Sequence, residues 1–135
     1  RSLVDSSPVR DSIMLLGNIA DPSKLYSAMD CFVFPSIHEG LGIVLIEAQL
    51  AGLDCFVSSD VPNGARVSDR FHPIPLSRPA VSWAAEISSA AACPRDRSRC
   101  DFHAGALERF DVRSSYHILE GAYEAALAQG GHNEH

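Results

Sequence analysis

The segment from Cys31 to Gly52 constrains the fold of this chain more than any other stretch. It begins with an apolar run, Cys31–Phe34, passes through a turn with one proline and two glycines, and ends in a mostly apolar run that Gly52 closes. Such an order indicates a buried strand, a tight turn and a buried helix. Because the strand shows almost no polar alternation, it is typical of a parallel sheet that is covered on both faces.

Similar elements flank this segment. Ile13–Leu16 is predicted to form a short buried strand, and Asp54–Val57 is predicted to form another after the central helix. Between the first two strands, Asp21–Pro22 predicts a helix start, because Asp is a good N-cap and Pro suits the first helical position. This helix is expected to end near Met29. Strands that alternate with single helices indicate βαβ units, so the predicted class is α/β with a Rossmann-like parallel sheet and flanking helices.

The second half of the chain gives weaker signals. Phe71–Leu76 contains two prolines and is predicted to be an edge strand at best. Ser77 is expected to cap a helix over about 78–92, and a final amphipathic helix is predicted over about 113–128. The charged segment 94–101 is the best linker candidate. Residues 1–135 are therefore interpreted as one domain portion, with a sheet core over about 13–76.

Composition excludes several classes of protein. A chain of 135 residues is the size of one ordinary domain, and its net charge of −6 argues against a general binder of nucleic-acid backbones. No apolar run reaches the ~18 residues that a membrane span needs, and no signal peptide is visible. The four cysteines lack paired C-x-x-C spacing, so we expect reduced thiols and no zinc site.

Two glutamates frame the central turn. Glu39 precedes the glycines, and Glu47 follows within the helix, with seven residues between them. A helix that begins near Gly42 places Glu47 ~7 Å along its axis, so both carboxylates can face the same crevice. Gly40 and Gly42 let backbone N–H groups approach a ligand, and the positive end of the helix dipole favours a phosphate. Carboxylates accept hydrogen bonds from sugar hydroxyls, so the pattern describes a phosphate pocket flanked by sugars.

Structural roles compete with this interpretation. Glu39 could simply complement the helix dipole. Glu47 could occupy an exposed helix position, but its apolar neighbours leave little polar face, so we expect it to be buried and in need of partners. The residues alone favour a ligand role and a structural role about equally. His38 has no second ligand at metal-binding spacing, and Leu45 stands where a dinucleotide fingerprint needs its third glycine.

One known family matches these residues. The run Phe34–Ser36, followed by Glu39–Ala48, resembles the retaining nucleotide-sugar glycosyltransferases of family 4, and is most similar to their bacterial exopolysaccharide and capsule branch. Two glutamates with seven intervening residues are the signature of that family. Further similar segments are Leu15–Gly17, Leu25–Asp30, Ala51–Leu53, Ser59–Pro62, Trp83–Ala84 and, more weakly, Gly121–Tyr123.

The resemblance implies a two-domain GT-B fold, with the active site between two Rossmann-like domains. The chain corresponds to part of the C-terminal, donor-binding domain. The N-terminal domain, which contacts the acceptor, and two strand–helix units with the cations that neutralise the donor diphosphate have no counterpart here. We therefore expect this chain alone to be inactive as a transferase and to bind nucleotides weakly. The expected location is the cytoplasm, with the inner face of the membrane open for the parent protein.

The resemblance also implies roles for individual residues. Glu39 lies beside the donor sugar and is the candidate catalytic residue, and Glu47 binds the ribose diol of the nucleotide. The backbone amides near the sugar and the diphosphate belong to Gly40, Leu41, Gly42, Ile43 and Val44. Gly17 and Asn18 are weaker candidates near the nucleobase. The family binds its donor without a metal, so no metal or other cofactor is expected.

The expected function is transfer of a sugar from a nucleoside diphosphate sugar to a glycan or lipid-linked acceptor in polysaccharide biosynthesis, with retention of anomeric configuration. The parent would be a hexosyltransferase-type enzyme. Acceptor contact, and any membrane contact, would come through the N-terminal domain. One alternative is a non-catalytic remnant or nucleotide-binding module. A second is another nucleotide-binding α/β enzyme, such as an epimerase-type protein, which the absent third glycine disfavours.

Overall fold

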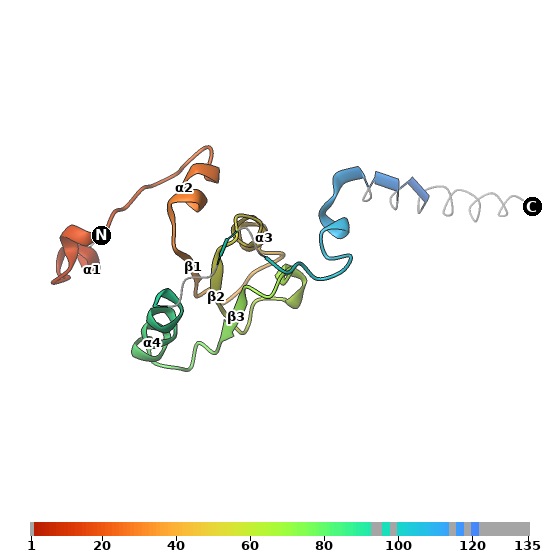
Figure 1. Ribbon diagram of the computed structural model, residues 1–135. Coiled ribbons are helices and arrows are strands. Elements are labelled where there is room, and N and C mark those ends of the chain that lie inside the picture. Colours follow the sequence, from red (N-terminus) through yellow and green to blue (C-terminus); the bar gives the residue numbers. More distant parts are fainter. Residues whose placement is uncertain (1, 93–95, 98–99, 114–115, 118–119, 122–135) are drawn as a thin grey trace, which may run out of the picture.

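A three-stranded parallel sheet forms the centre of the computed structural model, which describes residues 2–92, 96–97, 100–113, 116–117 and 120–121. The strands are β1 (Cys31–Phe34), β2 (Asp54–Ser58) and β3 (Phe71–Ile74), in the order β1-β2-β3 (Figure 1). Their parallel pairing confirms the predicted α/β class and the strands predicted at Cys31–Phe34 and Asp54–Val57.

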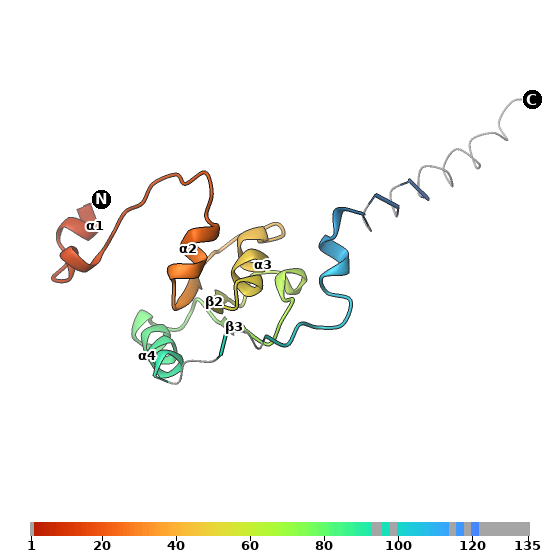
Figure 2. The ribbon, with the colours of Figure 1, turned by 45° about the horizontal axis from the view of Figure 1, so that its top comes forward.

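Helices cover both faces of this sheet. α3 (Ile43–Leu50) lies over one face and α4 (Ala80–Ala91) over the other, as Figures 1 and 2 show. On the α3 side, the buried core residues include Leu45, Ala48, Cys55 and Val57. On the α4 side, Trp83 packs with Phe56 and Ile74. Because successive β2 residues face these two cores in turn, the strand is apolar throughout, which is the pattern that predicted it.

The helix before β1 begins one residue later than the sequence predicts. In α2 (Ser23–Ala28) the N-cap is Pro22, because its carbonyl accepts the first helical bonds from Leu25 N and Tyr26 N, and no side chain caps the helix; the predicted N-cap at Asp21 is therefore wrong. Asp21 lies just before the helix, where its Oδ1 accepts hydrogen bonds from Ser23 N at 3.1 Å and Ser23 Oγ at 2.7 Å. The helix ends at Met29, whose N–H donates to Leu25 O at 3.1 Å. These bonds lower the pKa of the Asp21 carboxyl, because the side-chain and backbone donors of Ser23 stabilise its charged form.

The predicted strand at Ile13–Leu16 is wrong. This segment has no regular structure, its four side chains are between 39% and 79% exposed, and Figure 1 shows it running apart from the sheet. A strand needs a neighbour for its backbone N–H and C=O groups. None of the described residues pairs with this segment, so its apolar composition does not produce a strand. It follows the short helices α1 (Ser2–Asp5) and η1 (Arg10–Ser12).

The predicted cap at Ser77 is also wrong, because α4 begins three residues later, at Ala80, after Pro79. A residue that precedes proline is pushed away from helical conformation, so Arg78 cannot lie inside the helix. The edge strand is confirmed, since β3 is the last strand of the described sheet. Its Pro73 is tolerated at an edge because its nitrogen is not needed for pairing with β2.

Residues 103–106 contact α3 and the loop between β2 and β3. Val67 O accepts a hydrogen bond from His103 N at 2.9 Å, and Ala106 packs with Ile46 and Val67. Beyond η3 (Glu108–Phe110), residues 112–113, 116–117 and 120–121 are helical, in agreement with the predicted helix over about 113–128, whose other residues lie outside those described. Half of the predicted linker, residues 94–95 and 98–99, and Cys93 also lie outside the described residues.

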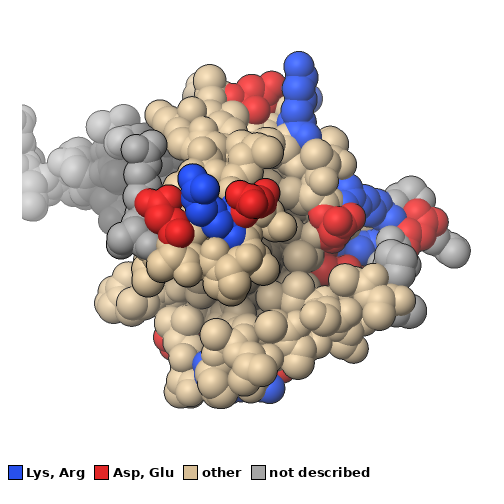
Figure 3. Space-filling model, turned by 90° about the vertical axis from the view of Figure 1, so that its left-hand side faces the viewer, with Lys and Arg blue, Asp and Glu red and all other residues tan. Residues whose placement is uncertain are grey.

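Surface properties agree with the composition. On the side drawn in Figure 3, acidic side chains lie next to basic ones, and wide areas of the surface carry neither. This surface differs from the one-sided basic face of a general nucleic-acid binder. Within the described ranges, no helix is both long and apolar enough to cross a membrane. Cys31, Cys55 and Cys100 are free thiols, and burial raises the pKa of the Cys55 thiol to about 12.

Candidate ligand-binding site

Gly42 is the structural centre of the candidate site. It is the N-cap of α3 and has φ +69°, a left-handed conformation that favours glycine. Its carbonyl accepts the first bond of the helix, from Leu45 N at 2.9 Å. A Cβ at this position would lie 3.2 Å from Leu45 Cδ1 and 3.5 Å from Glu39 Cγ. The backbone conformation therefore favours glycine here, and a larger side chain would also press on Leu45.

The N-terminus of α3 is open to a ligand. No side chain caps it, and the first N–H groups of a helix have no partner within the helix. The side chains of Ile43 and Val44 are 61% and 39% exposed, and a Cβ at Gly40 would meet no atom within 4 Å. This end of the helix lies at the carboxyl end of β1, the edge where open α/β sheets bind ligands. It can therefore hold an anion through backbone amides and the helix dipole.

Both predicted glutamates lie at this helix. Glu39 is half-buried, with its Cγ against Gly42 at the first turn of α3. Glu47 lies further along α3, where its Oε2 accepts a hydrogen bond from Tyr26 Oη at 2.9 Å. The expectation that Glu47 is buried is wrong, because the buried face of α3 is formed by Leu45, Ile46, Ala48 and Gln49, while its apolar neighbours on the other face are themselves exposed.

A groove between α2 and α3 leads past Glu47. It has a volume of about 400 Å³, and its lining includes Asp21, Ser23, Tyr26, Glu47 and Leu50. Burial, followed by the hydrogen bond and charge of Glu47, raises the pKa of the Tyr26 phenol to about 12. Tyr26 is therefore a hydrogen-bond donor at neutral pH.

The structure does not bring every predicted site residue together. Glu39 and the turn residues Gly40–Val44 lie at the N-terminus of α3, whereas Glu47 lies in its second half and lines the groove, which none of residues 39–44 lines. Gly17 and Asn18 instead lie on the exposed segment that precedes α2, and neither lines the groove. A Cβ at Gly17 would have no atom within 4 Å. Their role near a nucleobase stays a prediction.

Gln49 holds the loop that follows β2 against α3, a role that the sequence analysis missed. Its side chain is fully buried. Nε2 donates to Leu45 O at 2.9 Å and to Ala65 O at 2.8 Å, and Oε1 accepts from Val67 N and Ser68 N, both at 3.1 Å, and from Ser68 Oγ at 3.0 Å. One feature of the sequence indicates this role: Gln49 is the one amide side chain on a face of α3 whose other residues are apolar.

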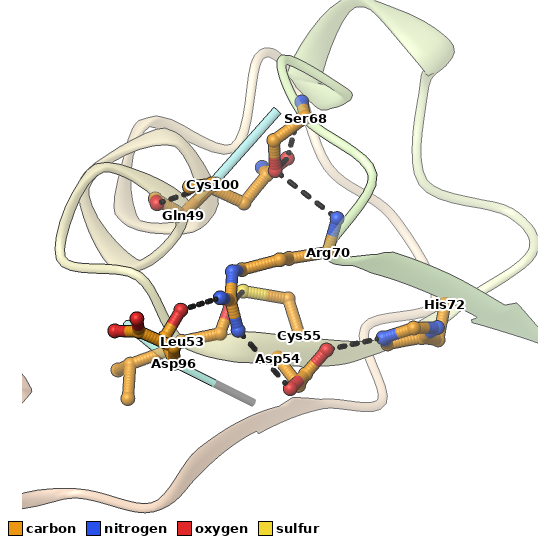
Figure 4. Close-up of polar contacts among 9 residues, drawn as sticks. All are labelled: Gln49, Leu53, Asp54, Cys55, Ser68, Arg70, His72, Asp96 and Cys100. Atoms are coloured by element: carbon orange, nitrogen blue, oxygen red, sulfur yellow. Dashed lines mark hydrogen bonds and ion pairs between the residues drawn. The ribbon is translucent and has the colours of Figure 1, made fainter. Parts of the chain in front are cut away.

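A second polar cluster lies at the opposite edge of the sheet, where β2 begins (Figure 4). Asp54 Oδ1 lies 2.7 Å from His72 Nε2, and its Oδ2 accepts from Arg70 Nη1 at 3.4 Å. Arg70 is only 1% exposed and also donates from Nη2 to Asp96 O at 2.7 Å. A pocket of about 360 Å³ beside it contains Asp30 and Arg97 as well. These paired charges join the loop after β2 to the sheet. In the part of the chain that the structure describes, no cluster of three His, Cys, Asp or Glu side chains could hold a metal ion.

These features define an α/β protein with a Rossmann-like sheet and a candidate ligand site at the carboxyl end of β1, the edge where open α/β sheets bind ligands. Comparison with known protein families shows to which family the chain belongs. The model of the family Glycosyl transferases group 1 matches residues 1–89, which include the central turn, both glutamates and all three strands. The chain belongs to this family.

Individual relatives agree with this assignment. The chain is 36% identical over 89 positions to the glycosyltransferase EpsF of Bacillus subtilis (strain 168). This match covers 63% of the chain and 22% of EpsF. The chain is also 36% identical over 63 positions to UDP-Gal:alpha-D-GlcNAc-diphosphoundecaprenol alpha-1,3-galactosyltransferase of Escherichia coli, covering 47% of this chain and 16% of that protein.

A third relative matches over a longer stretch. The D-inositol 3-phosphate glycosyltransferase of Segniliparus rotundus is 32% identical over 114 positions, covering 82% of this chain and 25% of that protein. The chain thus spans a quarter or less of the length of these relatives. No solved structure matches it.

Proposed function

We propose that this chain provides donor-binding elements of a retaining glycosyltransferase, which moves a sugar from a nucleoside diphosphate sugar to a glycan or lipid-linked acceptor. The observation that supports this most is the arrangement around α3. Glu39 lies at its open N-terminus beside Gly42, and Glu47 lies further along the same helix, next to the groove. An anion site between two carboxylates suits a diphosphate that joins two sugars.

Each group has a physical role in this proposal. The amides of residues 40–44 hold the donor diphosphate, because they lie at the positive end of the helix dipole. The Glu39 carboxylate accepts hydrogen bonds from the donor sugar. The Glu47 carboxylate accepts them from the ribose diol, as a bidentate acceptor can. The diphosphate leaves in the transfer step, so stabilising its developing charge is the main electrostatic task.

The relatives support the substrate classes. The name of the Escherichia coli relative gives UDP-Gal as its donor and a diphosphoundecaprenol-linked acceptor. For the present chain we propose a hexosyl donor, no metal, and a role in exopolysaccharide or capsule synthesis at the cytoplasmic side. The amides and dipole of α3 offer a charge-stabilising group that does not depend on a metal.

The proposal is tested by nucleotide affinity. Isothermal titration of the chain with UDP and with GDP is compared between the natural sequence and Glu47→Gln. A charge-assisted hydrogen bond contributes about 1.5–3 kcal/mol, so the affinity should fall about 10- to 150-fold. Glu108→Gln is the control, because Glu108 is exposed and lies on η3. Equal affinity of Glu47→Gln and the natural chain would overturn the assignment of Glu47.

A nucleotide-binding module without transfer activity is the second candidate. The short span of the match, 22% of EpsF, favours it for the chain by itself. Donor hydrolysis or transfer is measured with the chain alone and with Glu39→Ala. We expect no turnover above that control. Turnover above it would assign transfer activity to these residues themselves.

A further inference from the structure

The hydrogen bond between α2 and α3 suggests a role for a tyrosine in the groove. We infer that Tyr26 is a positioning residue: its phenol fixes one oxygen of the Glu47 carboxylate, so that the group is held ready for the ribose hydroxyls of a nucleotide. This inference rests on the proposed function, because it concerns the same glutamate. It adds a residue that sets the preference for ribose over deoxygenated sugars.

Tyr26 is itself held firmly. Only 7% of the residue is exposed, and its ring belongs to the core that also contains Leu45 and Ala48. The ring packs edge-on against Phe32, with centroids 6.0 Å apart and an angle of 72° between the planes. Its backbone N–H donates to Pro22 O at 3.1 Å in the first turn of α2. The ring of Tyr26 is therefore fixed by its packing, and its phenol oxygen lies at the groove.

Glu47 needs such a partner. It lies on the exposed face of α3, where a glutamate side chain would otherwise sample several rotamers. The Tyr26 Oη donates to Oε2 at 2.9 Å, whereas no described residue donates to Oε1. Both residues line the same groove, so the carboxylate is held at the place where a ligand would enter.

The energetic effect follows from this fixation. Ordering a flexible side chain on binding weakens affinity, and a side chain that is already ordered avoids most of that cost. Tyr26→Phe keeps the ring in the core but removes the donor. We expect its affinity for a ribonucleoside diphosphate to fall about 3- to 10-fold, which corresponds to immobilising one side chain.

The test compares two ligands that differ only in the ribose hydroxyls. Dissociation constants are measured for UDP and 2′,3′-dideoxy-UDP, and for the two corresponding guanosine compounds, with the natural chain, Tyr26→Phe and Glu47→Gln. The preference of Tyr26→Phe for the ribose form should fall about 3- to 10-fold, while its affinity for the dideoxy form stays unchanged. A thermal melt of each variant confirms that the fold is retained.

Tyr116→Phe is the matched control. Tyr116 also donates to a glutamate, Glu120 Oε1 at 3.4 Å, but it is 61% exposed and lies on the C-terminal helix. This variant should behave as the natural chain.

Three results would overturn the inference. An unchanged ribose preference in Tyr26→Phe, with Glu47→Gln losing it, refutes the role of Tyr26 and leaves the proposed function intact. An equal loss of affinity for both forms assigns Tyr26 a purely structural role. No ribose preference in the natural chain refutes the proposed role of Glu47 and, with it, the inference.

Discussion

Replacing Gln49 with methionine should strongly destabilise the fold. The two side chains are similar in length and shape, but methionine cannot form the hydrogen bonds of the amide. Its loss leaves the carbonyl of Ala65, the amides of Val67 and Ser68, and the Ser68 hydroxyl without their present partner in a fully buried place.

The magnitude can be worked out from these groups. Each buried group left without a partner costs about 1–3 kcal/mol, and the costs are less than additive where a loop can shift or admit water. Four such groups give an expected loss of about 3–5 kcal/mol in the free energy of unfolding. A domain of this size has a total stability of about 5–15 kcal/mol, so the variant should lose at least about a fifth of its stability.

Urea denaturation followed by circular dichroism measures this loss. Asn63→Met also replaces a side-chain amide with a thioether, at an exposed position of the same loop, and should shift stability by under about 0.5 kcal/mol. Ser68→Ala removes fewer bonds and should cost about 1–2 kcal/mol, which gives an intermediate point if the methionine variant does not fold. A loss of less than about 1 kcal/mol for Gln49→Met would refute the reasoning, because the unpaired groups would then cost almost nothing.

Two further predictions concern the site itself. Gly42→Ala should lower the free energy of unfolding in urea by about 1–2 kcal/mol, because alanine is strained in the left-handed region, and it should weaken nucleotide binding. Gly40→Ala should be nearly neutral, because Gly40 has open space around it. Equal losses of stability in the two variants would contradict this prediction. The pKa of Tyr26 rises from an ordinary value of about 10 to about 12 in the folded state. Stability from this group is therefore complete below about pH 10 and declines as the pH rises towards about 12. Tyr26→Phe should lack that decline, and parallel unfolding curves for the two proteins above about pH 10 would contradict it.

Sequence reasoning was reliable where local chemistry decides the structure. The apolar run Cys31–Phe34 forms a strand and Gly52, at φ +74°, closes α3, as predicted. The expectation that this strand is covered on both faces is wrong, because none of its residues is fully buried and Val33 is 42% exposed. The wrong cap at Ser77 has a local cause, Pro79, whereas two other failures depend on tertiary neighbours. Ile13–Leu16 has the composition of a strand but no described strand beside it, and Glu47 is exposed because α3 turns a different face to the core.

The site shows the same division. Spacing alone predicts Glu39 in the turn before the helix and Glu47 within it, because helical geometry fixes the rise along the axis. The partners across the fold could not be obtained that way. Tyr26 is 21 positions from Glu47, and Gln49 binds a loop up to 19 positions away. These hydrogen bonds depend on how α2 and the loop after β2 pack on α3. That packing cannot be predicted from the residues near each position in the sequence.

The central claim is that a nucleoside diphosphate binds at the N-terminus of α3. The most direct test is a titration of the isotope-labelled chain with UDP and GDP, followed by the amide resonances in nuclear magnetic resonance. The account predicts that the largest shifts occur in Gly40–Val44 and that Glu47→Gln needs about 10- to 150-fold more nucleotide to reach half of each shift. Shifts confined to the opposite edge of the sheet, around Asp54 and Arg70, or half-maximal shifts at the same nucleotide concentration in the variant, would contradict it.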